Sequence, residues 1–187
     1  MKNIITISAP SGTGKTTLCK AVQDEIPDIK WSVSFTTREK RMTEKDGVDY
    51  NFIPAEQFKN LIQKKFFLEW EKVHGNYYGT SYDVISKTLN SNNMLLIETD
   101  VKGAISIKKL YPSNTFAIFI MPPSLNDVRK RLKNRGTDSI ERINIRLERF
   151  QKEMDYVAKF DMKIINKDLN IAKGQLIKTI NSIKKGD

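Results

Sequence analysis

The chain has 187 residues, of which 39% are hydrophobic and 29% charged, with a formal net charge of +10. This length suits one domain with small insertions, and the composition excludes a disordered chain, while the absence of an apolar run of roughly 18 residues excludes a membrane-spanning helix. A lone Cys19 and a lone His74 exclude an internal disulfide, a Cys/His zinc site and a Ser/His/Asp triad.

The N-terminal segment predicts a strand, a glycine-rich turn and a helix in immediate succession. Residues 4–7 form a short apolar run, and a helix is expected from about residue 16 until Pro27 stops it. The apolar run is too short for a signal peptide and leads directly into the glycine-rich loop. We therefore expect a cytoplasmic protein.

Residues 34–83 have a different sequence pattern from the segments on either side. They contain short alternating segments at 48–52 and 67–71, with a Gly75-Asn76 turn after the second. This pattern predicts a small inserted domain of mixed sheet and helix.

The central part of the chain returns to continuous apolar strands. Residues 94–99 and 115–120 predict two strands, joined by an amphipathic helix near 102–110. A strand, a crossover helix and a second strand predict a parallel sheet flanked by helices, which is an α/β fold.

A second insertion, rich in Arg and Lys, is expected over residues 124–146. The helix after it has apolar residues at three-four spacing, which predicts that this set faces the core: Ile140, Ile143, Leu147, Phe150, Met154 and Val157. Residues 162–165 predict the last strand, and 171–184 the last helix.

The loop between the first strand and the first helix carries a phosphate-binding motif. Its glycines allow backbone N–H groups to face phosphate oxygens at the positive end of a helix. Lys15 is expected to contact the β- and γ-phosphates of ATP and Thr16 to ligate Mg²⁺, although Ala9 replaces the first glycine of the general motif. The predicted ATP-binding residues of this segment are Ala9, Pro10, Ser11, Gly12, Thr13, Gly14, Lys15, Thr16 and Thr17.

Five segments in order resemble the guanylate kinase family: SAPSGTGKT, VSFTTREKR, FLEW, GNYYGTS and NRGTDS. The resemblance covers essentially the whole chain. It implies a P-loop kinase core with a central parallel sheet, an inserted GMP-binding domain and a short lid. It also implies direct transfer of the γ-phosphoryl group of ATP to GMP, and to dGMP, with Mg²⁺. The implied boundaries are a core of 1–33, 84–123 and 147–187, a GMP-binding insertion of 34–83 and a lid of 124–146.

The same resemblance implies the residues that bind GMP. A hydroxyl at Ser34 would donate to guanine O6, Glu69 would accept from N1 and N2, and Thr80 would add a hydroxyl contact. With AMP, the Glu69 carboxylate would face the lone pair of adenine N1. A hydroxyl and a carboxylate together therefore distinguish guanine from adenine. The acceptor phosphate would be held by Arg38, Arg41, Tyr50 and Tyr78, since a doubly charged phosphate needs cationic forks and hydroxyl donors.

Further residues are implied on the ATP side. Arg131, Arg135 and Arg146 resemble arginines that close over the transferring phosphoryl group and act in catalysis with Lys15. Asp100 is implied in GMP binding, and Asn166 is expected beside the adenine of ATP. Glu98 stands where the family usually has an aspartate, which leaves its role open.

Three alternatives remain open from the sequence. A guanylate-kinase-like module could bind phosphorylated protein segments, but the chain keeps Lys15 and Thr16. A kinase for another nucleoside monophosphate is disfavoured by Ser34, Glu69 and Thr80. A nucleic-acid-binding protein has only the net charge in its favour. We expect ATP and GMP as substrates, and no nucleic acid, membrane or obligate protein partner.

Overall fold

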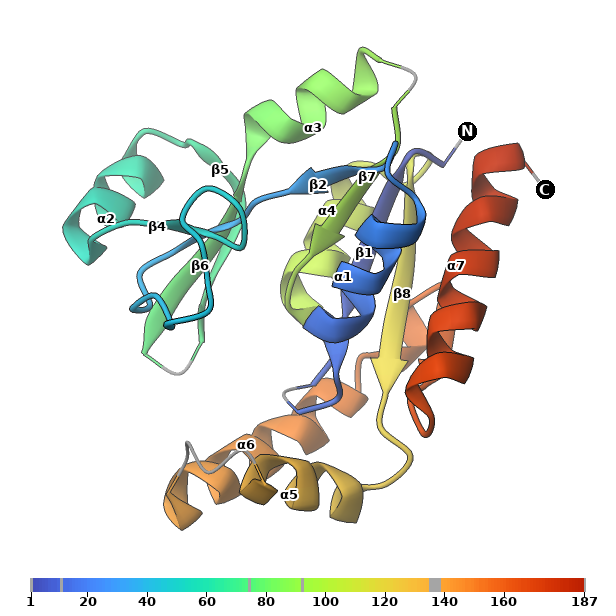
Figure 1. The fold of residues 1–187 in the computed structure, drawn as a ribbon. Helices are drawn as coiled ribbons and strands as arrows, with labels where there is room; N and C mark the ends of the chain where they lie inside the picture. The colour runs from blue at the N-terminus through green and yellow to red at the C-terminus, as the bar shows by residue number, and fades with distance from the viewer. Residues whose placement is uncertain (1, 11, 74, 92, 135–138, 187) are drawn as a thin grey trace.

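Two sheets organise the computed structural model, which describes residues 2–10, 12–73, 75–91, 93–134 and 139–186 (Figure 1). The first sheet comprises β1 (Ile4–Ser8), β2 (Lys30–Ser32), β7 (Leu95–Glu98), β8 (Thr115–Met121) and β9 (Met162–Ile165). The second comprises β3 (Phe35–Thr36), β4 (Asn51–Phe52), β5 (Phe67–Val73) and β6 (Asn76–Ser81). The helices are α1 (Lys15–Glu25), α2 (Ala55–Gln63), α3 (Tyr82–Leu89), α4 (Val101–Leu110), α5 (Leu125–Asn134), α6 (Ile140–Met154), a 3-10 helix η1 (Val157–Lys159) and α7 (Leu169–Lys185).

The first sheet is parallel throughout, with the order β2-β7-β1-β8-β9. The strands predicted at 4–7, 94–99, 115–120 and 162–165 are confirmed to within a residue at each end. Strand β1 is buried at every position, as expected of a strand covered on both faces. Because all five strands point the same way, their carboxyl ends meet at one edge of the sheet.

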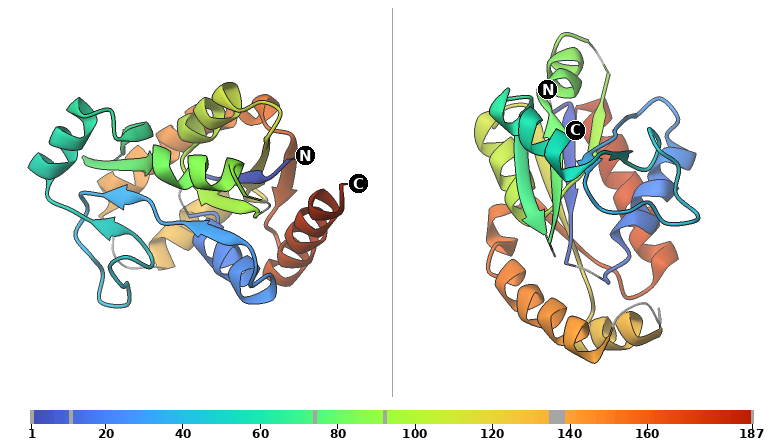
Figure 2. Two further views of the ribbon diagram at one scale, coloured as in Figure 1. Left: turned by 90° about the horizontal axis from the view of Figure 1, so that it is seen from above. Right: turned by 90° about the vertical axis from the view of Figure 1, so that its left-hand side faces the viewer.

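Helices cover both faces of this sheet (Figures 1 and 2). Helices α1 and α7 pack on one face, where Leu18, Val22 and Leu176 join the apolar side chains of β1, β8 and β9. Helices α3 and α4 cover the other face through Ile85 and Ile107. Helix α1 begins directly after Gly14, a residue in the left-handed conformation, and ends at Glu25, two residues before Pro27.

The second sheet lies within residues 35–81 and projects to one side of the first (Figure 2). Its strand order is β4-β3-β6-β5, and β6 pairs antiparallel with β3 on one side and with β5 on the other. Phe58 of α2 stacks on Phe67 with ring centroids 4.3 Å apart. The strand predicted at 48–52 is shorter than expected: only Asn51–Phe52 is a strand, because residues 48–50 form a turn closed by a hydrogen bond from the Gly47 N–H to the Tyr50 carbonyl.

Helices α5 and α6 pack on each other beyond the carboxyl ends of the parallel strands (Figure 1). Their contact is made by Val128 and Leu132 of α5 with Ile143, Leu147 and Phe150 of α6. The prediction that Ile140 and Val157 share this core face is wrong. Ile140 is 74% exposed, since it is the first residue of α6 and extends beyond the α5 contact; Val157 belongs to η1, because α6 ends at Met154.

No helix in the described ranges is both long enough and apolar enough to cross a membrane.

Candidate functional site

The site forms where the parallel strands end, because β1 and β7 are direct neighbours in the sheet. The pairing runs from Ile4 with Leu95 to Ile7 with Glu98. The phosphate loop after β1 therefore lies beside the segment Glu98-Thr99-Asp100 after β7, although about 85 residues separate them in sequence.

Lys15 and Thr16, the first two residues of α1, both contact the end of β7. The Lys15 ammonium donates to the Thr99 carbonyl at 2.8 Å and lies 3.8 Å from the Glu98 carboxylate. The Thr16 hydroxyl donates to the same Glu98 oxygen at 2.8 Å. The longer Glu98 side chain, in place of an aspartate, thus spans the gap between the strand and the loop.

Two residues far along the chain hold the phosphate loop from the other side. The Asn166 amide donates to the Thr13 carbonyl at 2.6 Å, and the Arg131 guanidinium donates to the Thr13 and Asn166 carbonyls at 3.3 and 2.8 Å. Gly14 is required here, because its φ is +90° and a Cβ would lie 2.6 Å from the Asn166 amide nitrogen. Asn166 therefore stabilises the conformation of the phosphate loop and also lies beside it.

A hollow of about 470 Å³ opens beside this loop. It is lined by Gly12, Gly14, Thr17, Arg131, Asn134, Asn166, Lys167 and Leu169. The predicted ATP-binding residues Gly12, Gly14, Thr17 and Asn166 are thus brought together around one cavity. Predicted residues Ser11 and Arg135 lie outside the described residues.

On the second sheet, Glu69 of β5 is half-buried, and its carboxylate lies against two hydroxyl groups. Thr80 donates to its carboxylate at 2.6 Å and Thr99 at 3.4 Å. Burial raises the pKa of the Glu69 carboxyl to about 7; the two hydroxyl donors oppose that rise, and the nearby charges of Asp100 and Glu71 add to it. Among the described residues no ion pair joins this carboxylate to a cation, so its partial burial is unfavourable for stability.

The raised pKa predicts how stability depends on pH. Since the folded pKa of about 7 exceeds the ordinary 4.5, the contribution of Glu69 to stability is fully present below pH 4.5 and is lost as pH rises through 7. Glu69→Gln, which stays neutral, should raise the free energy of unfolding at pH 8 by up to about 3 kcal/mol, and by much less near pH 5. Chemical denaturation without nucleotide at both pH values measures this, with Glu71→Gln on the same strand as the control. Equal stabilities of Glu69→Gln and the unchanged protein at pH 8 would contradict it.

The predicted phosphate-binding residues Arg38, Tyr50 and Tyr78 gather on the second sheet. The rings of Tyr50 and Tyr78 are edge to face at 6.0 Å, and the Arg38 guanidinium lies 5.5 Å from the centre of the Tyr50 ring. Glu44 accepts two hydrogen bonds from Arg38, at 2.9 and 3.0 Å, and lies 3.6 Å from the Arg41 guanidinium. Burial raises the pKa of Glu44, but its hydrogen bonds with Arg38 and the Arg41 N–H outweigh this, so the pKa is lowered.

The remaining predicted residues have varied surroundings. Ser34 is buried, between β2 and β3. Asp100 caps α4 by accepting from the Gly103 N–H at 2.8 Å. Arg146 lies half-exposed in the middle of α6, and not at its start as the sequence suggested, because α6 already begins at Ile140.

Ion pairs join the two sheets across the site. Lys20 of α1 pairs with Asp49 at 2.6 Å, and Lys102 of α4 pairs with Glu71 of β5 at 3.0 Å. Each pair connects a helix that packs on the first sheet to the part of the chain that contains the second sheet.

Sequence reasoning missed Glu44, Thr99, Gly103 and Arg149, all of which contact predicted site residues. Glu44 follows Arg41 by three residues, so the pair was open to detection as a local charge pattern. The contact of Arg149 with Asp100 joins distant segments, and the sequence carries no signal for it.

Comparisons with known proteins agree on one family. The guanylate kinase family model matches residues 1–183. The chain is 43% identical to a guanylate kinase of Caldanaerobacter subterraneus subsp. tengcongensis, over 90% of this chain and 82% of that protein. It is 40% identical to a guanylate kinase of Prochlorococcus marinus subsp. pastoris, over 97% of this chain and 98% of the relative. The crystal structure of guanylate kinase from Anaplasma phagocytophilum has a TM-score of 0.79 at 27% identity, over 98% of this chain and 86% of that one.

Proposed function

The chain belongs to the guanylate kinase family and is an ATP:GMP phosphotransferase, and from that premise we propose which of its residues carry the transfer. One observation supports the assignment most directly. Thr99 accepts a hydrogen bond from Lys15 at its carbonyl and donates one to Glu69 from its hydroxyl. The proposed phosphate-binding lysine and base-reading carboxylate thus contact the same residue, which supports neighbouring sites for the two nucleotides.

ATP would be bound by the phosphate loop and the hollow beside it. The N–H groups at the start of α1 favour anionic phosphate oxygens, and Lys15 would stabilise the charge that develops on the transferring group. Adenine would lie in the hollow near Asn166, whose amide meanwhile holds the loop in shape.

The residues at the phosphate loop fit Mg²⁺. The Thr16 hydroxyl and the Glu98 carboxylate lie 2.8 Å apart, and both are oxygen donors of the kind that Mg²⁺ prefers. Within the described ranges no three carboxylate, histidine or cysteine side chains form a metal site of their own. We assign Thr16 as the protein ligand; the ion, when bound with ATP, would neutralise charge on the β- and γ-phosphates.

GMP would be bound between the second sheet and the end of β7. Glu69 would accept from guanine N1 and N2, and Ser34 and Thr80 would supply hydroxyl contacts. The Asp100 carboxylate would make a further contact with GMP. The acceptor phosphate would be held by Arg38, Arg41, Tyr50 and Tyr78. The raised pKa of Glu69 supports this role, because two N–H donors on guanine would favour its ionised form.

The chain would divide into a core, a GMP-binding insertion at 34–83 and a lid at 124–146. Arg131, Arg135 and Arg146 would come over the phosphoryl group as the lid closes. Arg131 already contacts the phosphate loop, which supports its part. The boundary at 146 falls inside the continuous helix α6, so α6 would carry lid motion toward the core.

Transfer would proceed in line, without a covalent intermediate. Cys19 is fully buried, and burial raises the pKa of its thiol well above the ordinary value, so it is not a nucleophile. The acceptor phosphate is itself anionic at neutral pH and needs no strong base. Catalysis would then rest on positioning and charge stabilisation.

The acceptor range is the direct test. ATP- and Mg²⁺-dependent ADP formation would be measured with GMP, dGMP, AMP, CMP and UMP separately, and with no acceptor. We expect turnover with GMP and dGMP, and at least about 100-fold lower kcat/KM with AMP, because Glu69 would face an unpaired lone pair. Equal use of AMP would contradict the role of Glu69, and turnover with no acceptor at all would contradict closure by the lid. No turnover with any nucleotide would favour the phosphopeptide-binding module.

A further inference from the structure

Arg149 of α6 joins two carboxylates at the edge of the site. Its Nη2 lies 3.4 Å from Asp100 Oδ2, and its Nε donates to Glu153 Oε1 at 2.7 Å. The Arg149 side chain is 27% exposed, and those of Asp100 and Glu153 are 20% and 13% exposed. These are partly buried contacts, so they are screened less by salt than a surface pair.

Asp100 is held at both of its carboxylate oxygens. Oδ2 lies against Arg149, and Oδ1 accepts from the Gly103 N–H at 2.8 Å, which caps α4. The carboxylate is therefore fixed between α6 on one side and the first turn of α4 on the other.

The first turn of α4 also forms a wall for the base-reading carboxylate. A Cβ at Gly103 would lie 2.6 Å from Glu69 Oε2 and 2.2 Å from the Thr99 hydroxyl. The Gly103 backbone therefore lies directly against Glu69. A continuous series of contacts runs from Arg149 through Asp100 and Gly103 to Glu69.

The charges explain why an arginine is needed at this point. Burial raises the pKa of Glu153, whereas Arg149 lowers it, and Asp100 adds negative charge near both Glu153 and Glu69. Without Arg149, the partly buried carboxylates of Asp100 and Glu153 would lose the cation they share, and the uncompensated charge of Asp100 would act on Glu69 nearby. Their repulsion would act on substrate binding before any chemistry.

We propose that Arg149 is a positioning residue for the acceptor nucleotide, which acts by holding the Asp100 carboxylate between α6 and the first turn of α4. This inference rests on the proposed role of Asp100 in GMP binding. It gives α6 a role on the acceptor side of the site, in addition to the role expected of its Arg146 on the ATP side.

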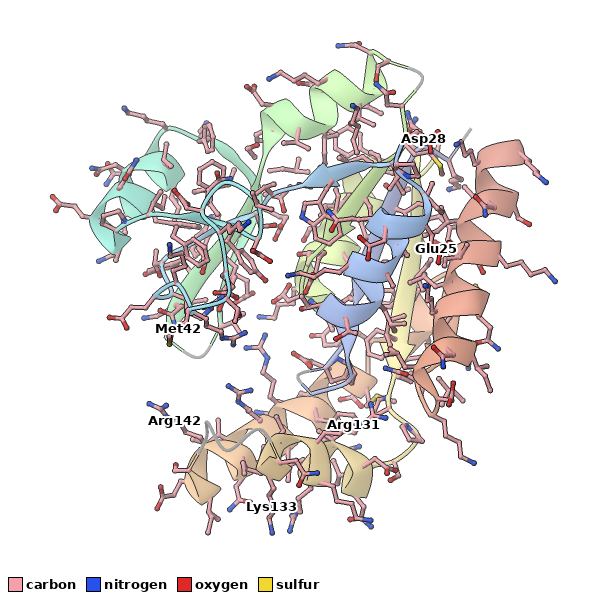
Figure 3. All side chains as sticks on the ribbon, in the orientation of Figure 1. Glu25, Asp28, Met42, Arg131, Lys133 and Arg142 are labelled. Atoms are coloured by element: carbon pink, nitrogen blue, oxygen red, sulfur yellow. The ribbon has the colours of Figure 1, made fainter. Side chains whose placement is uncertain are left out.

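The test compares Arg149→Met with Arg142→Met. Arg142 is exposed at the outer end of the same helix (Figure 3) and serves as the matched control. Arg149→Met should raise KM for GMP about five- to tenfold and leave KM for ATP within about twofold, since the lost contact serves one substrate. Arg142→Met should leave both constants within about twofold. Should Arg149→Met fail to fold, Arg149→Lys, which keeps one charge but not the two-carboxylate fork, should give a smaller rise in the same constant.

Asp100→Asn separates this inference from the proposed function. If Arg149 acts through Asp100, then Arg149→Met added to Asp100→Asn should change KM for GMP by less than about twofold. The same rise in both backgrounds would overturn the proposal, as would a rise in both KM values together, which indicates only a structural role. If Asp100→Asn leaves KM for GMP unchanged, Asp100 does not bind GMP, and both the proposed role of Asp100 and that of Arg149 are overturned. An impaired Asp100→Asn with a normal Arg149→Met would overturn the role of Arg149 alone.

Discussion

Lys15→Met is expected to lower kcat by about 1,000-fold or more, because it removes the cation that would stabilise the transferring phosphoryl group. The side chain follows directly after the phosphate loop, and its ammonium already reaches the end of β7 at the Thr99 carbonyl, 2.8 Å away. Methionine has a similar length and no charge, so the loss tests charge and not size. The measurement is single-turnover ADP formation at saturating ATP, Mg²⁺ and GMP.

GMP binding should survive this change. Glu69 and Arg38, which would bind the acceptor, lie in the part of the chain that carries the second sheet, and among the described residues no hydrogen bond joins either of them to Lys15. Calorimetry should therefore give a Kd for GMP within about threefold of the unchanged protein. Lys173→Met on α7, which removes a surface pair with Glu25, is the control and should retain normal turnover. Retained turnover in Lys15→Met would remove Lys15 from the mechanism.

Glu69→Gln is expected to lower kcat/KM for GMP by about 100- to 1,000-fold, because the amide turns one hydrogen-bond acceptor into a donor facing the N–H groups of guanine. The Thr80 hydroxyl can still donate to the remaining oxygen, so the pocket should keep its shape. The substitution is predicted above to stabilise the protein at pH 8. A loss of activity together with a gain of stability is the behaviour expected of a binding residue and not of a structural one.

Kinetics with GMP and AMP measure this effect. Glu71→Gln is the matched control, since Glu71 lies two residues away on β5 and pairs with Lys102 at the surface. It should change kcat/KM for GMP by less than about twofold. Comparable losses in the two variants would indicate a general electrostatic effect and would remove Glu69 as the base-reading group.

Much of the fold was predictable because its strands are buried on both faces. A strand such as β1, with no exposed position, reads as a continuous apolar run, and β8 is similar, whereas the edge strand β9 has two exposed positions. Short strands in the second sheet carry weaker signals: β3 and β4 have two residues each, and pairing with β6 stabilises β3 more than its own sequence does. The end of α6 at Met154 also could not be read from periodicity, because Val157 keeps the apolar spacing into η1.

The site was predictable where its residues form contiguous motifs. The phosphate loop is local in sequence, and its expected chemistry follows from residue type and spacing, whereas the expected role of the Arg38 segment comes from the family resemblance. The contacts of Asn166 with Thr13 and of Arg149 with Asp100 are not of this kind, because they join residues 153 and 49 positions apart. Only the packing of α6 and β9 against the strand ends brings such groups together.

Glu44 would give the proposed acceptor site an anion that remains with the protein through every turnover. Its carboxylate binds the Arg38 guanidinium through two hydrogen bonds and lies 3.6 Å from that of Arg41. When GDP leaves, the partly buried Arg38 guanidinium would keep this internal partner and would not be left without a counterion. Product departure is thereby made easier, and a small free anion such as inorganic phosphate, which lacks the guanine contacts at Glu69, must compete with Glu44 to occupy the site. The same pair would thus favour both rapid exchange of nucleotide and resistance to inhibition by cellular phosphate.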